Sequence, residues 1–197
     1  QYPYCYISDE YPDDVPWDKD QILIVTIDIE VECENGFPNP QDAAEPLLSI
    51  TMKNHQNKKI VVWGLHEFQN SREDVDYRLC RDENDLLIKF LDEWRMIYPD
   101  IITGWNTEFF DIPYICNRIK NLFDEDFMHK LSPWNNVFAK EVYQMGRKHQ
   151  VYSIQGVSAL DFFDLYRKFT YTNQERYTLD HIAFVELGER KDGNPFE

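Results

Sequence analysis

The sequence is short of basic residues. Its 197 residues include 20 Lys and Arg against 36 Asp and Glu, which gives a formal net charge of −16 at pH 7. A chain with so negative a charge gains no nonspecific affinity for a polyanion from its overall field. We therefore expect a nucleic-acid ligand only if the acidic residues surround cations and basic residues are concentrated locally.

The patterns of disulfide frameworks, zinc sites and membrane spans are also missing. The four cysteines form no Cys-x-x-Cys pair and have no histidine at zinc-finger spacing, which disfavours a disulfide framework and structural zinc. The N-terminus has no basic stretch before an apolar one, and no run approaches the roughly 20 apolar residues of a membrane span. We expect a soluble, cytoplasmic protein without a membrane partner.

Several enzyme classes are excluded because their motifs are absent. The five histidines form no His-Glu-x-x-His, and the sequence has neither Gly-x-Ser-x-Gly nor a glycine-rich phosphate loop. Metalloprotease, serine-hydrolase and P-loop functions therefore have no residues to support them.

The residues that are present predict one folded domain. Hydrophobic residues make up 43% of the chain and aromatic residues 15%, which is too much bulky apolar material for a disordered protein. Residues 1–20 carry prolines and acids without periodicity, so we interpret them as a linker or the tail of a preceding domain. Residues 21–197 are the predicted domain, of a length that suits a single core.

The predicted elements indicate a mixed α/β fold. Periodicity and turn signals predict strands at 21–32, 46–52, 59–65 and 101–104, helices at 84–98, 112–122, 156–169 and 179–187, and a hairpin at 137–154. Asn84 is the expected N-cap of the first helix. A three-strand meander followed by helix, strand and helix is typical of a mixed sheet flanked by helices, and a ribonuclease-H-like architecture matches best.

The first predicted strand ends in two acidic residues. Asp28 and Glu30 are two positions apart, so their side chains leave the same face of the sheet, about 6–7 Å apart at Cβ. Like charges placed this way raise each other's pKa unless a cation or solvent relieves them. The pair is therefore either a cation site or a strand end that runs into solvent.

A third acidic residue stands where the next part of the chain turns from strand to helix. Asp111 lies at or near a helix start in GWNTEFFDIPYI, residues 104–115, where it either faces the site or complements the helix dipole as an ordinary first-turn residue. Three carboxylates from two segments can hold two Mg²⁺ or Mn²⁺ ions roughly 3.5–4 Å apart, the arrangement that hydrolyses phosphodiesters. Two-metal phosphoryl chemistry is the remaining candidate.

Two of these segments resemble the exonuclease motifs of family B DNA polymerases. IDIEVE around Asp28 is similar to the first motif, and GWNTEFFDIPYI is similar to the second, which has the form GxNxxxFDxPY. The stretch YSIQGVSALDFFDLYRKFTYTNQERYTLDHIA resembles the part that follows the second motif in polymerases of T-even-like bacteriophages. The Asp-x-Glu pair alone is weak evidence, whereas the twelve-residue second motif is strong.

The resemblance implies a proofreading 3′–5′ exonuclease domain of a replicative DNA polymerase. Asp28, Glu30 and Asp111 would be the catalytic ligands of two Mg²⁺ or Mn²⁺ ions, and the substrate would be the 3′ end of single-stranded DNA. The implied partners are the remaining domains of a parent polymerase and, through that parent, a sliding clamp. A phage-encoded enzyme would work in the host cytoplasm.

The resemblance also implies DNA-binding residues. Asn106 and Phe110 match positions that hold the terminal nucleotides, Phe110 by stacking or wedging on a base, although Phe110 suits a packed core equally well. Arg147 and Lys148 are predicted at the exposed tip of the hairpin, next to a turn at Gly146. That hairpin resembles one that keeps primer and template strands apart, while a solvated turn would favour the same basic residues.

One part of the family pattern is missing. The third exonuclease motif, Tyr-x-x-x-Asp, and its His-x-x-x-Asp variant do not occur, and Tyr177 and Asp180 are one residue too close together to supply it. We therefore expect an exonuclease domain that is truncated at its C-terminus, with little activity of its own. The alternatives are a catalytically silent single-strand-binding or structural module and a free-standing exonuclease from a split polymerase gene.

Overall fold

A computed structural model describes residue 10 and residues 18–33, 36–144 and 146–190. The predicted linker at 1–20 therefore lies mostly outside the described residues. The elements, in chain order, are η1 (Lys19–Gln21), β1 (Ile24–Val31), β2 (Leu47–Asn54), β3 (Ile60–Gly64), β4 (Val75–Leu79), α2 (Glu83–Ile97), β5 (Ile101–Thr103), α3 (Asp111–Leu122), α4 (Glu125–His129), β6 (Val137–Gln144), β7 (Arg147–Ile154), β8 (Ser158–Ala159), α5 (Phe162–Phe169) and α6 (Leu179–Leu187).

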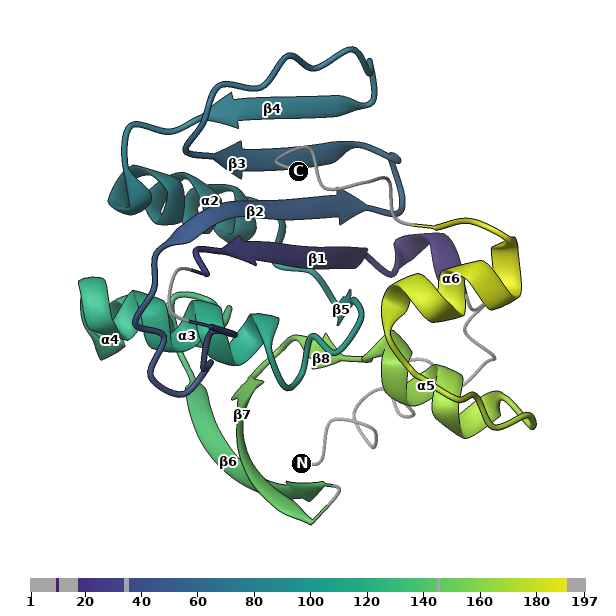
Figure 1. The fold of residues 1–197 in the computed structure, drawn as a ribbon. Coiled ribbons are helices and arrows are strands. Elements are labelled where there is room, and N and C mark those ends of the chain that lie inside the picture. The colour runs from purple at the N-terminus through teal and green to yellow at the C-terminus, as the bar shows by residue number, and fades with distance from the viewer. Residues whose placement is uncertain (1–9, 11–17, 34–35, 145, 191–197) are drawn as a thin grey trace.

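The central feature is a six-stranded sheet in the order β4-β3-β2-β1-β5-β8 (Figure 1). β2 runs antiparallel to both β1 and β3, whereas the pairs β3/β4, β1/β5 and β5/β8 are parallel. The strands β6 and β7 form a separate antiparallel pair. The predicted mixed α/β fold and the predicted hairpin at 137–154 are both confirmed.

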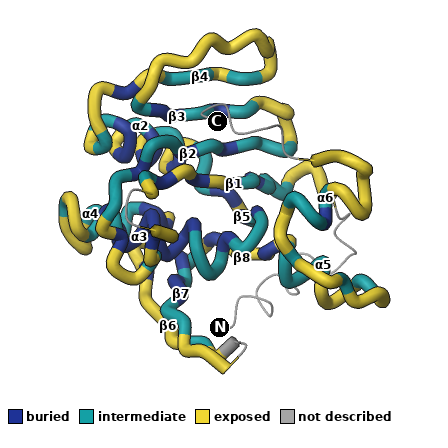
Figure 2. The backbone as a smooth tube through the Cα atoms, viewed as in Figure 1, coloured by how far each residue is buried: buried dark blue, intermediate teal, exposed yellow. Residues whose placement is uncertain are grey.

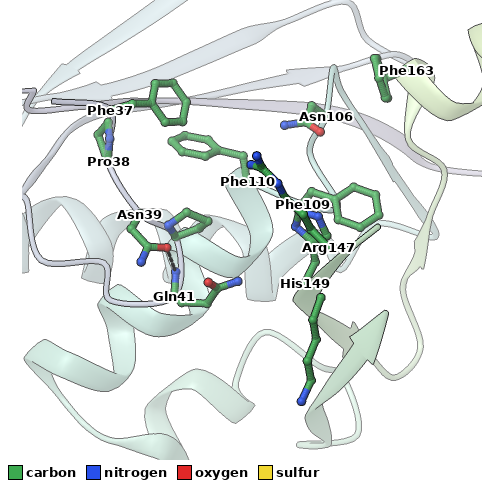
Figure 3. Close-up of a pocket in the computed structure, with 12 residues that line it drawn as sticks. Phe37, Pro38, Asn39, Gln41, Asn106, Phe109, Phe110, Arg147, His149 and Phe163 are labelled. Atoms are coloured by element: carbon green, nitrogen blue, oxygen red, sulfur yellow. Dashed lines mark hydrogen bonds between the residues drawn. The ribbon is translucent and has the colours of Figure 1, made fainter. Parts of the chain in front are cut away.

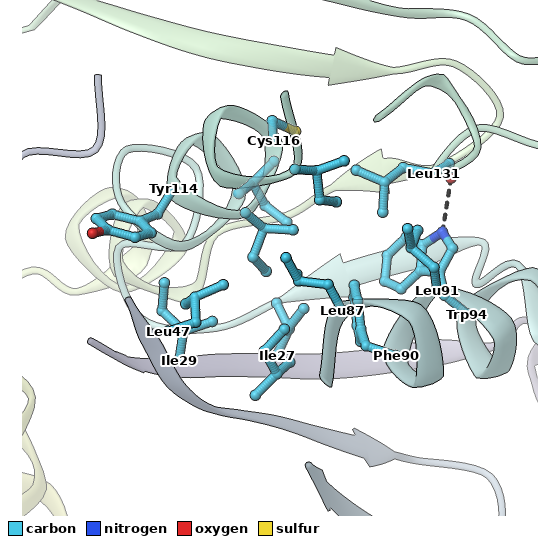
Figure 4. Close-up of a cluster of buried hydrophobic side chains, with 14 of the residues drawn as sticks. Ile27, Ile29, Leu47, Leu87, Phe90, Leu91, Trp94, Tyr114, Cys116 and Leu131 are labelled. Carbon is cyan, nitrogen blue, oxygen red and sulfur yellow. Dashed lines mark hydrogen bonds between the residues drawn. The ribbon is translucent and has the colours of Figure 1, made fainter. Parts of the chain in front are cut away.

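The alternation of β1 gives the sheet one buried and one more open face. Val25, Ile27 and Ile29 are buried, whereas Asp28 and Glu30 are exposed on the opposite face. Figure 2 shows buried residues in β1 and in α3. The buried face packs against α2 and α3, and together they enclose the hydrophobic core, to which α2 contributes a row of buried side chains at helical spacing (Figure 4). Because the apolar face of β1 is buried in this core, the face that carries Asp28 and Glu30 points away from it.

The local structure differs from the prediction in three places. The chain has an additional strand, β4, between β3 and α2, where we predicted no element. The cap of α2 is Asp82, whose side chain accepts a hydrogen bond from Asp85 N, and not Asn84. The helix predicted at 156–169 is shorter, because its first part forms β8, and α5 begins only at Phe162.

The helices α5 and α6 follow β8 and lie apart from the layer formed by α2 and α3 (Figure 1). None of the helices in the described part of the chain is long and apolar enough to cross a membrane.

Candidate functional site

The two acidic residues of β1 lie on the same face of the sheet, as their spacing requires. Asp28 is paired across the sheet with Thr51 and Glu30 with Ser49, so small hydroxyl side chains neighbour both carboxylates. Both acidic residues are exposed. This part of the sheet is therefore open to solvent and rich in oxygen atoms.

Asp111 reaches the same strand from α3, of which it is the first residue. Its Oδ1 accepts a hydrogen bond from the backbone N–H of Ile29 at 3.1 Å, and the residue is only 4% exposed. Since Ile29 lies between Asp28 and Glu30, this bond fastens the start of α3 to β1 at the position of the acidic pair.

The parallel pairing of β1 and β5 explains why Asp111 lies next to β1. Thr103, the last residue of β5, is paired with Thr26, so the chain leaves β5 beside Ile27 and Asp28. The segment 104–110 then crosses this end of β1 and enters α3. Loops that leave the carboxyl ends of neighbouring parallel strands commonly form binding sites.

The environment of Asp111 disfavours its charge. Burial, and next the negative charge of Asp28, raise the pKa of the Asp111 carboxyl to about 7, although the hydrogen bond from Ile29 N–H acts in the opposite direction. A cation next to these carboxylates would favour the ionised form. The structure thus brings Asp28 and Asp111 close enough for their charges to interact, with Glu30 on the same face of β1.

The metal-binding prediction itself stays a prediction. Within the described part of the chain, no group of three His, Cys, Asp or Glu residues is arranged so that it could hold a metal ion. The carboxylates of Asp28, Glu30 and Asp111 therefore share one region of the sheet without forming a closed cluster.

The segment between β5 and α3 has a conformation that depends on particular residues. A Cβ atom on Gly104 would lie 2.1 Å from Thr107 Oγ1 and 2.7 Å from the Ile27 carbonyl oxygen, so only glycine fits there. Asn106 has a φ of 65°, a left-handed conformation that asparagine tolerates better than most residues. The segment therefore passes very close to β1.

Asp161 holds this segment from the other side. Its Oδ1 accepts hydrogen bonds from Asn106 N at 3.0 Å and Phe163 N at 2.9 Å, and its Oδ2 accepts one from Glu108 N at 3.0 Å. Burial raises the pKa of the Asp161 carboxyl, while these three N–H donors oppose the rise. The single carboxylate of Asp161 thus caps α5 and also fixes the segment that leads to Asp111.

An aromatic cluster supports the same segment. The indole N–H of Trp105 donates a hydrogen bond to the Tyr177 carbonyl at 3.2 Å, and the Trp105 ring contacts the rings of Phe163 and Tyr166. The guanidinium of Arg167 lies over the rings of Phe163 and Tyr177. Through this cluster, α5 and the chain that follows it pack against the segment 104–110.

The four predicted DNA-binding residues line one pocket. Its volume is about 540 Å³, and it combines aromatic rings, prolines and basic side chains (Figure 3). The full lining consists of Phe37, Pro38, Asn39, Pro40, Gln41, Asn106, Phe109, Phe110, Arg147, Lys148, His149 and Phe163. The structure thus brings Asn106 and Phe110 together with Arg147 and Lys148, which are the first two residues of β7 and are exposed.

Rings from separate segments meet in this pocket. Phe110 lies 5.3 Å from the ring of Phe37, and Phe109 lies 5.3 Å from the ring of His149. Phe37 is 85% exposed, so a large apolar surface faces solvent. Lys148 also forms an ion pair with Glu141 across the hairpin at 2.5 Å.

Two of the residues that shape the site escaped the prediction from sequence. Phe37 stands between Gly36 and Pro38 shortly after the acidic strand, and an aromatic residue in such a segment was the available signal. Asp161 has no comparable local signal, because two of its three partners come from the distant segment 104–110.

Comparisons with known proteins agree with the motifs. The exonuclease domain model of DNA polymerase family B matches residues 5–182. The chain is 33% identical to the DNA-directed DNA polymerase of Escherichia phage RB69 and 31% identical to that of Enterobacteria phage T4, in each case over 95% of this chain and 24% of the polymerase. The DNA polymerase delta catalytic subunit of Candida albicans is 28% identical over 92% of this chain. The chain spans about a quarter of the length of the two phage polymerases.

Proposed function

The chain belongs to the exonuclease domains of family B DNA polymerases, and on that basis we propose that it removes 3′-terminal nucleotides from single-stranded DNA. In this proposal residues 21–197 form a proofreading 3′–5′ exonuclease domain with a ribonuclease-H-like fold, and residues 1–20 are a linker or the tail of a preceding domain. Its partners are the remaining domains of a replicative polymerase and, through them, a sliding clamp. The mixed six-stranded sheet, with α2 and α3 packed against it, supports this fold.

The observation that carries the proposal is the hydrogen bond between Ile29 N–H and Asp111 Oδ1. It brings a carboxylate from α3 to the strand that carries Asp28 and Glu30. Burying a carboxyl group beside another acidic residue is unfavourable for folding. Carboxyl groups placed where they destabilise the fold are typical of a site that binds cations and performs chemistry.

Magnesium or manganese ions fit the donor atoms of this site. Carboxylate oxygens are the ligands that hard divalent cations prefer, and Asp28, Glu30 and Asp111 would hold two such ions. When bound, the ions supply an activated water and stabilise the leaving oxygen of the phosphodiester. Because the three carboxylates do not form a closed cluster, we expect ion binding to draw them together and to lower the pKa of Asp111.

The pocket beside the carboxylates would hold the end of the DNA strand. Phe110 offers a ring on which a base can stack, and such stacking tolerates every base. Asn106 offers an amide for hydrogen bonds, and Arg147 and Lys148 offer positive charge for phosphates. This local concentration of basic residues allows DNA binding in spite of the net charge of −16.

A catalytically silent single-strand-binding module is the second candidate. It is favoured by the lack of a three-residue metal cluster among the described residues. In that case the pocket binds the strand, but the carboxylates do not support hydrolysis.

The two candidates differ in an exonuclease assay. We would measure the release of 3′ mononucleotides from a labelled single strand in Mg²⁺ and then in Mn²⁺, with the unaltered chain, Asp28→Ala, and Asp92→Asn as a control on the exposed surface of α2. We expect slow hydrolysis, because the third motif of the family is missing, and we expect Asp28→Ala to abolish it and Asp92→Asn to retain it. Phe110→Ala should weaken binding of the strand roughly tenfold.

The outcomes separate the proposals. Binding that depends on Phe110 without any metal-dependent hydrolysis would support the silent module. Hydrolysis that persists in Asp28→Ala, or a chain that neither binds nor hydrolyses the strand, would contradict the exonuclease assignment.

A further inference from the structure

The pocket at the candidate site has two walls that come from distant parts of the sequence. One wall is the segment 37–41, which follows β1, and the other is the start of β7, with Arg147, Lys148 and His149 (Figure 3). β6 and β7 form a sheet of their own, and the segment 37–41 belongs to no strand. The distance between the walls is therefore not fixed by the register of a common sheet.

One buried side chain of α3 is hydrogen-bonded to both walls. Asn117 Nδ2 donates to the Pro40 carbonyl at 2.8 Å, and Asn117 Oδ1 accepts a hydrogen bond from the Tyr152 hydroxyl at 2.5 Å. Pro40 belongs to the first wall, and Tyr152 lies in β7, the strand that carries the second. Asn117 is 8% exposed and Tyr152 is 7% exposed, so water has little access to either bond.

The chemistry of these groups allows only one arrangement. A backbone carbonyl can only accept a hydrogen bond, so the amide nitrogen of Asn117 must face Pro40, and the amide oxygen is left for the hydroxyl of Tyr152. Both bonds are made at the same time in a buried environment, where losing either one leaves an unpaired polar group.

Neighbouring side chains of α3 have a different role. Tyr114, Arg118 and Asn121 donate hydrogen bonds to backbone carbonyls within residues 42–45 and so fasten that segment to the helix. Asn117 bonds to Pro40 and also to the hairpin. Asn117 therefore joins the segment 37–41 to β7, whereas the backbone carbonyls that Tyr114, Arg118 and Asn121 contact all belong to the segment 42–45.

We propose that Asn117 is a positioning residue that couples the two walls of the pocket through its bonds to Pro40 and Tyr152. The coupling keeps the 37–41 wall and the Arg147 wall at the spacing that the end of a single strand requires. This role in DNA binding rests on the proposed function, whereas the mechanical coupling is a property of the chain alone.

Hydrogen exchange tests the coupling without DNA. Tyr152→Phe removes only the hydroxyl, and Tyr98→Phe is a matched control, since the Tyr98 hydroxyl donates to the Lys130 carbonyl away from the pocket. The reporters are the amides of Gln41 and Ala43, which are hydrogen-bonded to Asn39 within the first wall. Their exchange rates are compared with those of amides in β2 to correct for global opening.

We expect Tyr152→Phe to accelerate exchange at both reporters roughly five- to tenfold, as the loss of one buried hydrogen bond predicts, and Tyr98→Phe to leave it unchanged. Equal exchange in the two variants would overturn the coupling. Asn117→Ala should accelerate exchange as well, and adding Tyr152→Phe to it should bring little further change. If the accelerations of exchange caused by the two single changes multiplied in the double variant, the coupling would also be overturned.

A binding measurement connects the coupling to the proposed function. The probe is a single-stranded oligonucleotide with a fluorescent base at its 3′ end, and we expect Tyr152→Phe to weaken its binding about threefold or more relative to Tyr98→Phe. If the unaltered chain fails to bind the probe while the exchange effects are seen, the proposed function is wrong and the coupling stands. If the probe binds equally well to both variants and exchange is also equal, the coupling is wrong and the proposed function stands.

Discussion

At the scale of single residues, the buried carboxyl of Asp111 makes stability depend on pH. In the unfolded chain this group has its ordinary pKa of 3.8, whereas in the folded chain its pKa is about 7. The folded state holds the proton more tightly, so the contribution of Asp111 to stability is fully present below about pH 4. It declines as the pH rises and is lost above about pH 7, a total difference of about 4 kcal/mol at most.

Replacing Asp111 by Asn should therefore stabilise the metal-free chain, because the amide oxygen can still accept the hydrogen bond from Ile29 and carries no charge. We expect the gain in the free energy of unfolding to be about 2.5 kcal/mol larger at pH 8 than at pH 5. Urea unfolding at both pH values measures it. Asp92→Asn on the exposed surface is the control, and a gain from Asp111→Asn that is equal at both pH values would refute this account.

At the scale of elements, Asp161 connects the cap of α5 to the segment that carries Asn106. Asp161→Asn keeps one acceptor but turns an NH₂ group toward a backbone N–H, so we expect the free energy of unfolding to fall by about 1–3 kcal/mol. Asp82→Asn at the cap of α2 is the matched control, because asparagine caps helices as well as aspartate does. Equal stabilities of the two variants in urea would show that Asp161 acts only as a cap.

The sequence predicts those elements whose signals are local. Alternation in β1 places Asp28 and Glu30 on one face, and the β-prone flanks of Gly146 predict the hairpin that the structure contains. β4 was missed because its five residues, VDYRL, alternate too briefly and include two charges. Its parallel pairing with β3 depends on tertiary structure.

Another difference between prediction and structure, the late start of α5, also arises from pairing between distant segments. Ser158 N and Leu160 N donate hydrogen bonds to the carbonyls of Asp100 and Ile102, and this pairing with β5 draws the chain out of the helix that the periodicity predicts. The proximity of Asp111 to Asp28 likewise depends on the parallel pairing of β1 with β5. Such long-range pairing cannot be predicted from the periodicity of either segment alone.

At the scale of the whole molecule, one partly buried ion pair joins α2, α3 and the segment after β1. Arg118 donates to both carboxylate oxygens of Glu83, at 2.7 and 2.6 Å, and also to the carbonyls of Ala43 and Ala44. Glu83 in turn accepts a hydrogen bond from Leu47 N at 2.8 Å. The side chains of the pair are 11% and 12% exposed.

Arg118→Ala should lower the free energy of unfolding by up to about 3–5 kcal/mol, because it leaves the partly buried Glu83 carboxylate without its partner. Arg118→Ala combined with Glu83→Ala should cost less than the sum of the two single changes. Arg72→Ala is the control, since Arg72 pairs with Asp74 on the exposed surface, and we expect little change from it. Urea unfolding of the four variants measures these changes. If Arg72→Ala lowered the free energy of unfolding as much as Arg118→Ala, the Arg118–Glu83 pair would have no special role in stability.

The strand order has a further consequence for the chain as it is synthesised. β1, β2, β3 and β4 lie within the first part of the described chain, whereas β5 and β8, which complete the sheet on the other side of β1, come after α2. N-terminal segments leave the ribosome first, and pairing of distant strands closes slowly. The edge of β1 that β5 will cover is therefore unpaired for a time, and an unpaired edge is a template for aggregation. The rate of translation between β4 and β5 sets how long each nascent chain exposes that edge to its neighbours.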